Sequence, residues 1–175
     1  VLSQSGYGEQ SRFALRALRS REDIFDIYIQ PITWGETGWI WEDNEFRRWM
    51  DSRITDTALL MNQKQLNPDI SLQITIPNEW EKLCPVNIGY TAGIETTHVS
   101  PQWLVKGNDM NKILVVSEHA KSTYIDTVAT ATNSKTGEEV PYRLNVPIEV
   151  VHERTVISES EPIEGLEFPS KFNFL

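Results

Sequence analysis

Three short segments of this chain carry residues whose types and spacing suit chemistry. The first holds Gly6, Tyr7 and Gly8, at a turn just before a predicted helix. Glycines at such a turn let the backbone approach a ligand, and the amides and dipole of the helix can stabilise an anion such as a phosphate. The segment lacks the third glycine of a dinucleotide-binding fingerprint and the lysine of a P-loop. An ordinary strand-to-helix turn explains it about as well as a phosphate site does.

The second segment follows a short apolar run that ends at Thr91 and presents Glu95 and His98. In open α/β sheets, ligands bind outside the carboxyl ends of the strands. A carboxylate and an imidazole in such a loop can act as acid, base or acceptor for a sugar hydroxyl. The alternative is that Glu95 caps a turn and that His98 is simply exposed.

The third segment is an aromatic loop that contains Trp34, Trp39 and Trp41. Indole rings stack well on the apolar faces of sugars or on bases, although packing in a core or at a domain interface is the more common use of such residues. A further pair, Ser117 and Glu118, follows another apolar run and fits either a helix N-cap or a ligand contact.

Several classes of function are disfavoured by composition. The chain has 16 Lys and Arg against 25 Asp and Glu, a formal charge of −9, which argues against a nucleic-acid partner. Its three histidines share no metal-ligand spacing and its one cysteine, Cys84, has no partner for a disulfide or a zinc site, so no metal is expected. Ser100 lacks the glycine pattern of a serine-hydrolase nucleophile.

The elements that position these residues follow from the hydrophobic pattern. Apolar and β-branched runs predict strands, with a strict alternation in Ile70–Ile76. Val1 and Leu2 fit the end of another strand. The predicted strands are 24–30, 70–76, 86–91, 112–117 and 148–152, and the predicted helices are 9–20, a short one through Phe46 and Met50, 56–64, one from Pro101 and 118–127. Strands that alternate with helices indicate the α/β class, with a Rossmann-like parallel sheet flanked by helices.

Chain length and composition divide the sequence into parts. Residues 1–152 are enough for one domain with a sizeable core. Residues 153–170 are acidic and contain Pro162, Gly165 and Pro169, a linker composition, and 171–175 alternate like the first strand of another domain. The chain has no signal-peptide pattern and no stretch of 18 apolar residues, and membrane association is not evident, so we expect a cytoplasmic location.

Taken in order, four motifs resemble the N-terminal half of a GT-B glycosyltransferase. The similarity is to the large retaining family that includes glycogen-synthase-like and mannosyltransferase-like enzymes, and it spans residues 5 to about 152. The motifs are Ser5-Gly-Tyr-Gly-Glu9 before a helix, Pro77-Asn-Glu-Trp80, Ile88-Gly-Tyr-Thr-Ala-Gly-Ile-Glu95 with Pro101-Gln-Trp103, and Ile113-Leu-Val-Val-Ser-Glu118.

This resemblance implies two Rossmann-like domains that face a cleft, with the chain as the acceptor-side domain. Gly6, Tyr7 and Gly8 match a glycine-rich loop near the donor diphosphate, and Ser117 and Glu118 match a strand end that lines the cleft. Glu95 or His98 falls where the family places its central acceptor-side residue, and the Trp34–Trp41 loop would shape the acceptor side.

The implied reaction transfers a hexosyl group from a nucleotide sugar to a glycan, lipid or small-molecule acceptor with retained configuration. The donor is a substrate, and no separate cofactor is implied. The family's Glu-x7-Glu motif belongs to the C-terminal domain, so this chain alone is expected to be inactive without that partner domain. The rival hypothesis is a non-catalytic Rossmann-like module that binds a small ligand or a protein.

Overall fold

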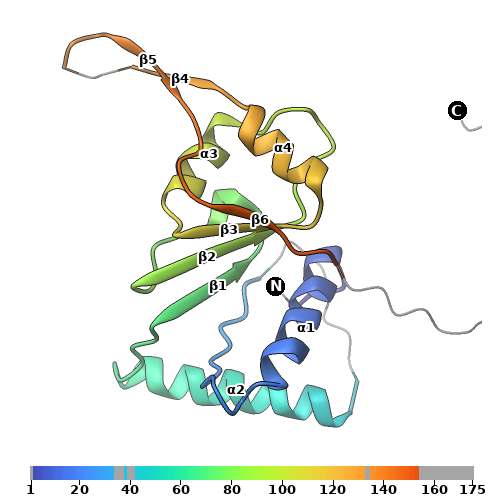
Figure 1. The fold of residues 1–175 in the computed structure, drawn as a ribbon. Coiled ribbons are helices and arrows are strands. Elements are labelled where there is room, and N and C mark those ends of the chain that lie inside the picture. Colours follow the sequence, from blue (N-terminus) through green and yellow to red (C-terminus); the bar gives the residue numbers. More distant parts are fainter. Residues whose placement is uncertain (1, 34–37, 39–41, 133–134, 154–175) are drawn as a thin grey trace, which may run out of the picture.

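The chain forms an α/β fold in which helices flank a parallel sheet on both sides, a Rossmann-like arrangement (Figure 1). The computed structural model describes residues 2–33, 38, 42–132 and 135–153. The predicted fold class is confirmed. The predictions that fall on 154–175, which are the linker and the first strand of a further domain, lie outside the described residues and stay predictions.

The sheet contains β1 (Ile70–Ile74), β2 (Val86–Thr91), β3 (Lys112–Val115) and β6 (Ile148–Val150), in this order and all parallel. Each of these strands was predicted from its apolar run, within two residues at either end. The short 3-10 helix η1 (Pro77–Glu79) follows β1, because Pro77 cannot donate to a strand ladder.

Helices α3 (Pro101–Asn108) and α4 (Glu118–Asp126) cover one side of the sheet (Figure 1). Ser100 and Ser117 cap them by accepting hydrogen bonds from backbone amides of the first turn, as their positions in the sequence indicate. We call the cluster beneath them the sheet core. The side chains of this core that are fully excluded from solvent are Trp80, Leu104, Ile113, Val115 and Tyr124.

Helices α1 (Gly6–Arg19) and α2 (Glu45–Asn62) lie on the other side of the sheet (Figure 1). Here the prediction of two separate helices is wrong, because α2 is continuous. The stretch between the two predicted helices contains no proline or glycine, and ion pairs between Arg47 and Asp51 and between Arg53 and Asp56 span it at helical spacing.

The predicted strand at 24–30 is also wrong. Its alternation is real, since Ile27 and Ile29 are buried while Tyr28 is exposed. The backbone, however, pairs with a helix side chain: the Ile29 amide donates to Thr57 Oγ1 on α2 at 2.9 Å. The two isoleucines pack with Leu2 and Met50 into a second cluster, which we call the N-terminal cluster.

One element was not predicted. A hairpin of β4 (Ala129–Thr132) and β5 (Glu139–Tyr142) projects away from the body beyond α3 and α4 (Figure 1). Its strands, Ala-Thr-Ala-Thr and Glu-Val-Pro-Tyr, contain no run of large apolar residues, so the hydrophobic pattern does not separate them from loop. The strand end predicted at Val1 and Leu2 is not found at Leu2, which lies outside any strand. Ser3, the next residue, forms an isolated β-bridge.

Candidate functional site at the carboxyl edge of the sheet

The carboxyl ends of three strands meet in one row. Thr91 of β2 aligns with Val115 of β3, and Val115 aligns with Val150 of β6. Everything that follows these strands therefore emerges at the same edge, including the loop with Glu95 and His98, the start of α4, and His152. The parallel register thus brings the second predicted segment and the Ser117–Glu118 pair to one edge.

The first predicted segment reaches the same edge through Tyr7. Its hydroxyl lies 2.8 Å from Thr91 Oγ1, which joins the first turn of α1 to the last residue of β2. Thr91 is fully buried, and its Oγ1 also accepts from the Gly93 amide at 3.3 Å. Thr91 was not among the predicted site residues, although its place as the last residue of a buried strand is a signal that could have identified it.

The electrostatics around Tyr7 point to further groups at this edge. Burial raises the pKa of the Tyr7 phenol most, the hydrogen bond with Thr91 and one with the backbone at Ala92 act in the opposite direction, and the carboxylates of Glu153 and Glu79 raise it further. Two carboxylates that the sequence analysis did not assign to the site therefore act on Tyr7. The side chain of Glu79 also accepts a hydrogen bond from Thr75, just beyond β1.

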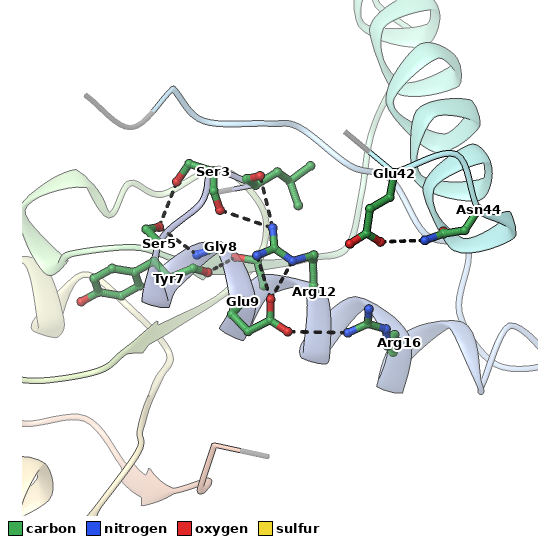
Figure 2. Close-up of polar contacts among 11 residues, drawn as sticks. Ser3, Ser5, Tyr7, Gly8, Glu9, Arg12, Arg16, Glu42 and Asn44 are labelled. Carbon is green, nitrogen blue, oxygen red and sulfur yellow. Dashed lines mark hydrogen bonds and ion pairs between the residues drawn. The ribbon is translucent and has the colours of Figure 1, made fainter. Parts of the chain in front are cut away.

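The two glycines of the first segment have different explanations. A Cβ on Gly8 would lie 1.9 Å from the backbone oxygen of Ser3, so this position is a glycine because the chain passes against α1 (Figure 2). A Cβ on Gly6 would meet nothing within 4 Å. Ser5 caps the helix by accepting from the Gly8 amide at 3.1 Å and lies 2.9 Å from the Ser3 hydroxyl (Figure 2). Of the two glycines, Gly6 is the one with open space beside it.

Gly93 lets the loop after β2 pass close to the start of α4, which Ser117 caps. Gly93 has φ +88°, a conformation that favours glycine, and a Cβ there would lie 2.6 Å from the Ala120 Cβ. The Ser117 hydroxyl accepts from the Ala120 amide at 3.0 Å. Of the two interpretations of Ser117, the helix cap is confirmed. Glu118 is exposed in the first turn of α4.

Glu95 and His98 are both exposed in their loop. The hydrogen bonds of His98 stay local, because its Nδ1 lies 3.0 Å from Thr97 Oγ1 and its carbonyl accepts from Thr96. The next residue anchors the loop: the Val99 amide donates to Thr127 Oγ1 at 2.9 Å. Both side chains are therefore accessible to a ligand, and their catalytic assignment stays a prediction.

The third segment cannot be placed, because Trp34, Trp39 and Trp41 lie outside the described residues. Within the described ranges, no group of three or more His, Cys, Asp or Glu side chains has the geometry to hold a metal ion. No helix in those ranges is both long and apolar enough to cross a membrane.

The site that results is an edge of open backbone and exposed polar groups. Gly6, Tyr7, the Glu95–His98 loop and the start of α4 surround it, with Glu79 and Glu153 acting on it electrostatically. The phenol, the carboxylates and the imidazole can exchange hydrogen bonds and protons with a hydroxylated ligand. Searches against protein-family models, curated proteins and solved structures find no match for this chain.

Proposed function

We propose that this chain is the acceptor-side domain of a retaining glycosyltransferase of the GT-B type. The observation that carries the proposal is the convergence of α1, the loop after β2 and the start of α4 at the carboxyl edge of a parallel sheet. This is the edge at which open α/β sheets bind ligands. The motifs that resemble the glycosyltransferase family supply three of the elements that meet there.

In the proposed reaction a nucleotide sugar gives its hexosyl group to an acceptor hydroxyl, and a nucleoside diphosphate leaves. Gly6 and Tyr7 lie beside the diphosphate, where the open backbone at Gly6 leaves space for it. Glu95 or His98 orients the acceptor or accepts its proton. The donor is held mainly by a second domain, whose basic groups neutralise the leaving diphosphate.

The test is a transfer assay on the full-length protein with nucleotide-sugar donors and glycan acceptors. We expect release of a nucleoside diphosphate together with a new glycosidic bond whose anomeric configuration is that of the donor. An inverted product would contradict the retaining assignment. Normal turnover by residues 1–175 alone would contradict the division of labour between two domains.

The rival is a binding module without catalysis. It predicts that the full-length protein binds a nucleotide sugar or a protein partner but forms no product with any donor. Sequence downstream of Leu175 also discriminates, because the glycosyltransferase proposal requires a second α/β domain with the Glu-x7-Glu motif, and the rival does not.

A further inference from the structure

A cavity of about 110 Å³ lies between α1 and the start of α2, apart from the groups assigned to the carboxyl edge. Figure 2 shows the side of α1 that lines it, with Glu9, Arg12 and Arg16 on the helix and Glu42 and Asn44 across from them. Its volume is far above the roughly 10–15 Å³ that one water molecule needs, and of the same order as a cavity of roughly 150 Å³ that admits a benzene ring. The cavity is smaller than that one and is open to solvent, so it can take in part of a six-membered ring whose remaining substituents stay outside.

Two of its guanidinium groups are fixed in place. The side chain of Arg12 is only 13% exposed, and its Nε and Nη2 contact Glu9 Oε2 at 2.9 and 2.8 Å. Its Nη1 lies 3.3 Å from the carbonyl oxygens of Leu2 and Ser3 (Figure 2). On α2, Arg47 is 16% exposed and donates from Nε to Asp51. The two guanidinium groups are therefore held rigidly at the wall of the cavity before any ligand arrives, while the N–H groups named here already donate within the protein.

Other groups at the cavity can still exchange hydrogen bonds with a ligand. Arg16 stands 4.0 Å from Glu9 Oε1, which is an ion pair without a hydrogen bond, and its guanidinium stacks 4.6 Å from the centroid of the Phe46 ring. Glu42 Oε2 accepts from the side-chain Nδ2 of Asn44 at 2.8 Å. Within the described residues, the guanidinium N–H groups of Arg16 and the Oε1 atom of Glu42 have no hydrogen-bond partner.

The charge of the lining selects between ligand classes. Arg12, Arg16 and Arg47 are balanced by three carboxylates, which belong to Glu9, Glu42 and Asp51. A phosphate or sugar acid would meet three carboxylates as well as three guanidinium groups, so the lining offers it no net positive charge. A neutral ligand with several hydroxyls can accept from the guanidinium groups and donate to the carboxylates, so it satisfies both kinds of group.

Apolar side chains complete the lining, since Leu2, Phe46 and Met50 also border the cavity. A wall of carbon beside paired donors and acceptors suits the mixed surface of a sugar ring. We propose that this cavity binds one neutral pyranose ring. That this ring belongs to the acceptor rests on the proposed function, whereas the binding itself does not.

The test titrates the ¹⁵N-labelled protein with methyl α-D-glucopyranoside and with methyl α-D-mannopyranoside. We expect at least one of them to shift the backbone amides around the cavity and the Nε–H signals of Arg12 and Arg47, with millimolar affinity. Inorganic phosphate and glucuronate serve as the anionic comparison. Because these shifts are measured on the unaltered protein, the location of the binding site is found without relying on the folding of any variant.

Two variants then test the groups that we expect to contact the sugar. Arg16→Gln and Glu42→Gln should each weaken binding about tenfold, the loss expected for one hydrogen bond to a charged group. Arg21→Gln and Glu81→Gln make the same chemical changes at exposed positions outside the cavity and should leave the affinity unchanged.

Several results would overturn the inference. They are the absence of shifts at the cavity with both glycosides at high millimolar concentration, tighter binding of phosphate or glucuronate than of either glycoside, and full affinity in both cavity variants. If a glycoside binds here but the full-length protein transfers no hexosyl group, the proposed function fails and this inference stands. If transfer occurs while the cavity does not respond to sugars, the reverse holds.

Discussion

The two sides of the sheet are packed by different means. In the sheet core, Trp80, Leu104 and Ile113 are fully excluded from solvent, and a Cβ on Gly89 would lie 2.6 Å from the Trp80 ring. Among the described residues, the N-terminal cluster has no member fully excluded from solvent, since Leu2, Ile27, Ile29 and Met50 keep 6–9% exposure. Polar contacts join its elements: a hydrogen bond from Ile29 to Thr57, and the Arg16 and Arg19 guanidinium groups stacked on Phe46 and Trp49.

The packing of each side suits the site that lies on it. The sheet core is tightly packed and fixes the strand ends that form the carboxyl edge. The N-terminal cluster is joined by directional polar contacts, and the cavity between α1 and α2 lies on that side. Tyr7 connects the two regions through its hydrogen bond with Thr91.

The largest expected effect is a difference between the two clusters in how much stability a truncation to alanine costs. Leu104→Ala should lower the free energy of unfolding by about 3–5 kcal/mol, because it leaves a cavity in the fully excluded sheet core. Met50→Ala should cost about 2 kcal/mol, since its surroundings are less tightly packed. Urea denaturation measures both. Leu59→Ala, at a position 54% exposed, is the control and should stay within about 0.5 kcal/mol. A greater loss for Met50→Ala would refute the comparison.

The two glycines at the start of α1 give the next effect. Gly8→Ala should destabilise by about 1–3 kcal/mol, since its Cβ would collide with the Ser3 backbone, which has to move. Gly6→Ala should be neutral or stabilise slightly, because the space beside it is open and alanine favours helix. Thermal unfolding of the pair checks this, and equal destabilisation by both would show that the close approach at Gly8 is not what matters.

The hydrogen bond that replaces strand pairing at 24–30 is testable through Thr57. Thr57→Val keeps the shape but leaves the buried Ile29 amide without its acceptor, so we expect a loss of about 1–3 kcal/mol. Thr55→Val is the matched control, since Thr55 is exposed and bonds to the Asp51 carbonyl within the same helix. Denaturant melts of both variants should differ. Similar losses would mean that Thr57 does not fix this segment.

Two tyrosines test the connection between the regions. Tyr7→Phe should cost about 1 kcal/mol at neutral pH, because it removes the hydrogen bond with Thr91. Within the described residues the Tyr124 hydroxyl is buried without a hydrogen-bond partner, so Tyr124→Phe should cost nothing or stabilise the sheet core. Equilibrium unfolding at neutral pH compares the two, and a larger loss for Tyr124→Phe would contradict the assignment.

The same two tyrosines are expected to lower the free energy of unfolding as the solution becomes alkaline. Burial raises the pKa of Tyr7 and of Tyr124 above the ordinary value of 10.0. Both phenols hold their protons more tightly when folded, so their contribution to stability is complete below pH 10.0 and is lost as pH rises above it. Tyr124→Phe should flatten this fall in urea melts across the alkaline range. An unchanged slope in that variant would refute the attribution.

The smallest effect belongs to the surface pairs of α2. Asp56→Asn removes the ion pair with Arg53 at helical spacing and should cost about 0.2–0.5 kcal/mol, less in high salt. Asp69→Asn, outside any helix, is a control. If the loss at Asp56 were as large as at Thr57, exposed charge rather than the buried hydrogen bond would hold this side together.

The sequence predicted the sheet better than it predicted the N-terminal side, and for a physical reason. The runs at 70–76, 86–91 and 112–117 each find a parallel neighbour, so local pattern and tertiary pairing agree. The run at 24–30 has the same alternation but meets Thr57 of α2 in place of a strand partner. The pattern fixes which side chains turn inward, and not what the backbone pairs with.

The site was predictable to a similar degree. The cap at Ser117 follows from a local signal, whereas the turn predicted at Gly6 to Gly8 is wrong, because these residues form the first turn of α1 after the Ser5 cap. The structure still brings this segment to the edge beside β2 through Tyr7. Glu79 and Glu153 act on Tyr7 from positions distant in sequence, and no local pattern, including the Pro77–Trp80 motif that contains Glu79, places either of them beside Tyr7. The cavity between α1 and α2 forms from two helices more than twenty residues apart, and its residues look like ordinary solvated faces in the sequence.

The central claim is that chemistry takes place at the carboxyl edge. The most direct test measures kcat/KM for hexosyl transfer by the full-length protein. It compares the variants Glu95→Ala and His98→Ala with the control Glu81→Ala. Glu81 is exposed in the segment between η1 and β2 and is not among the groups assigned to the carboxyl edge. We predict that Glu95→Ala or His98→Ala lowers kcat/KM by at least about a hundredfold, the contribution typical of a group that transfers a proton, while Glu81→Ala leaves it unchanged. Wild-type kcat/KM in both edge variants would contradict the account.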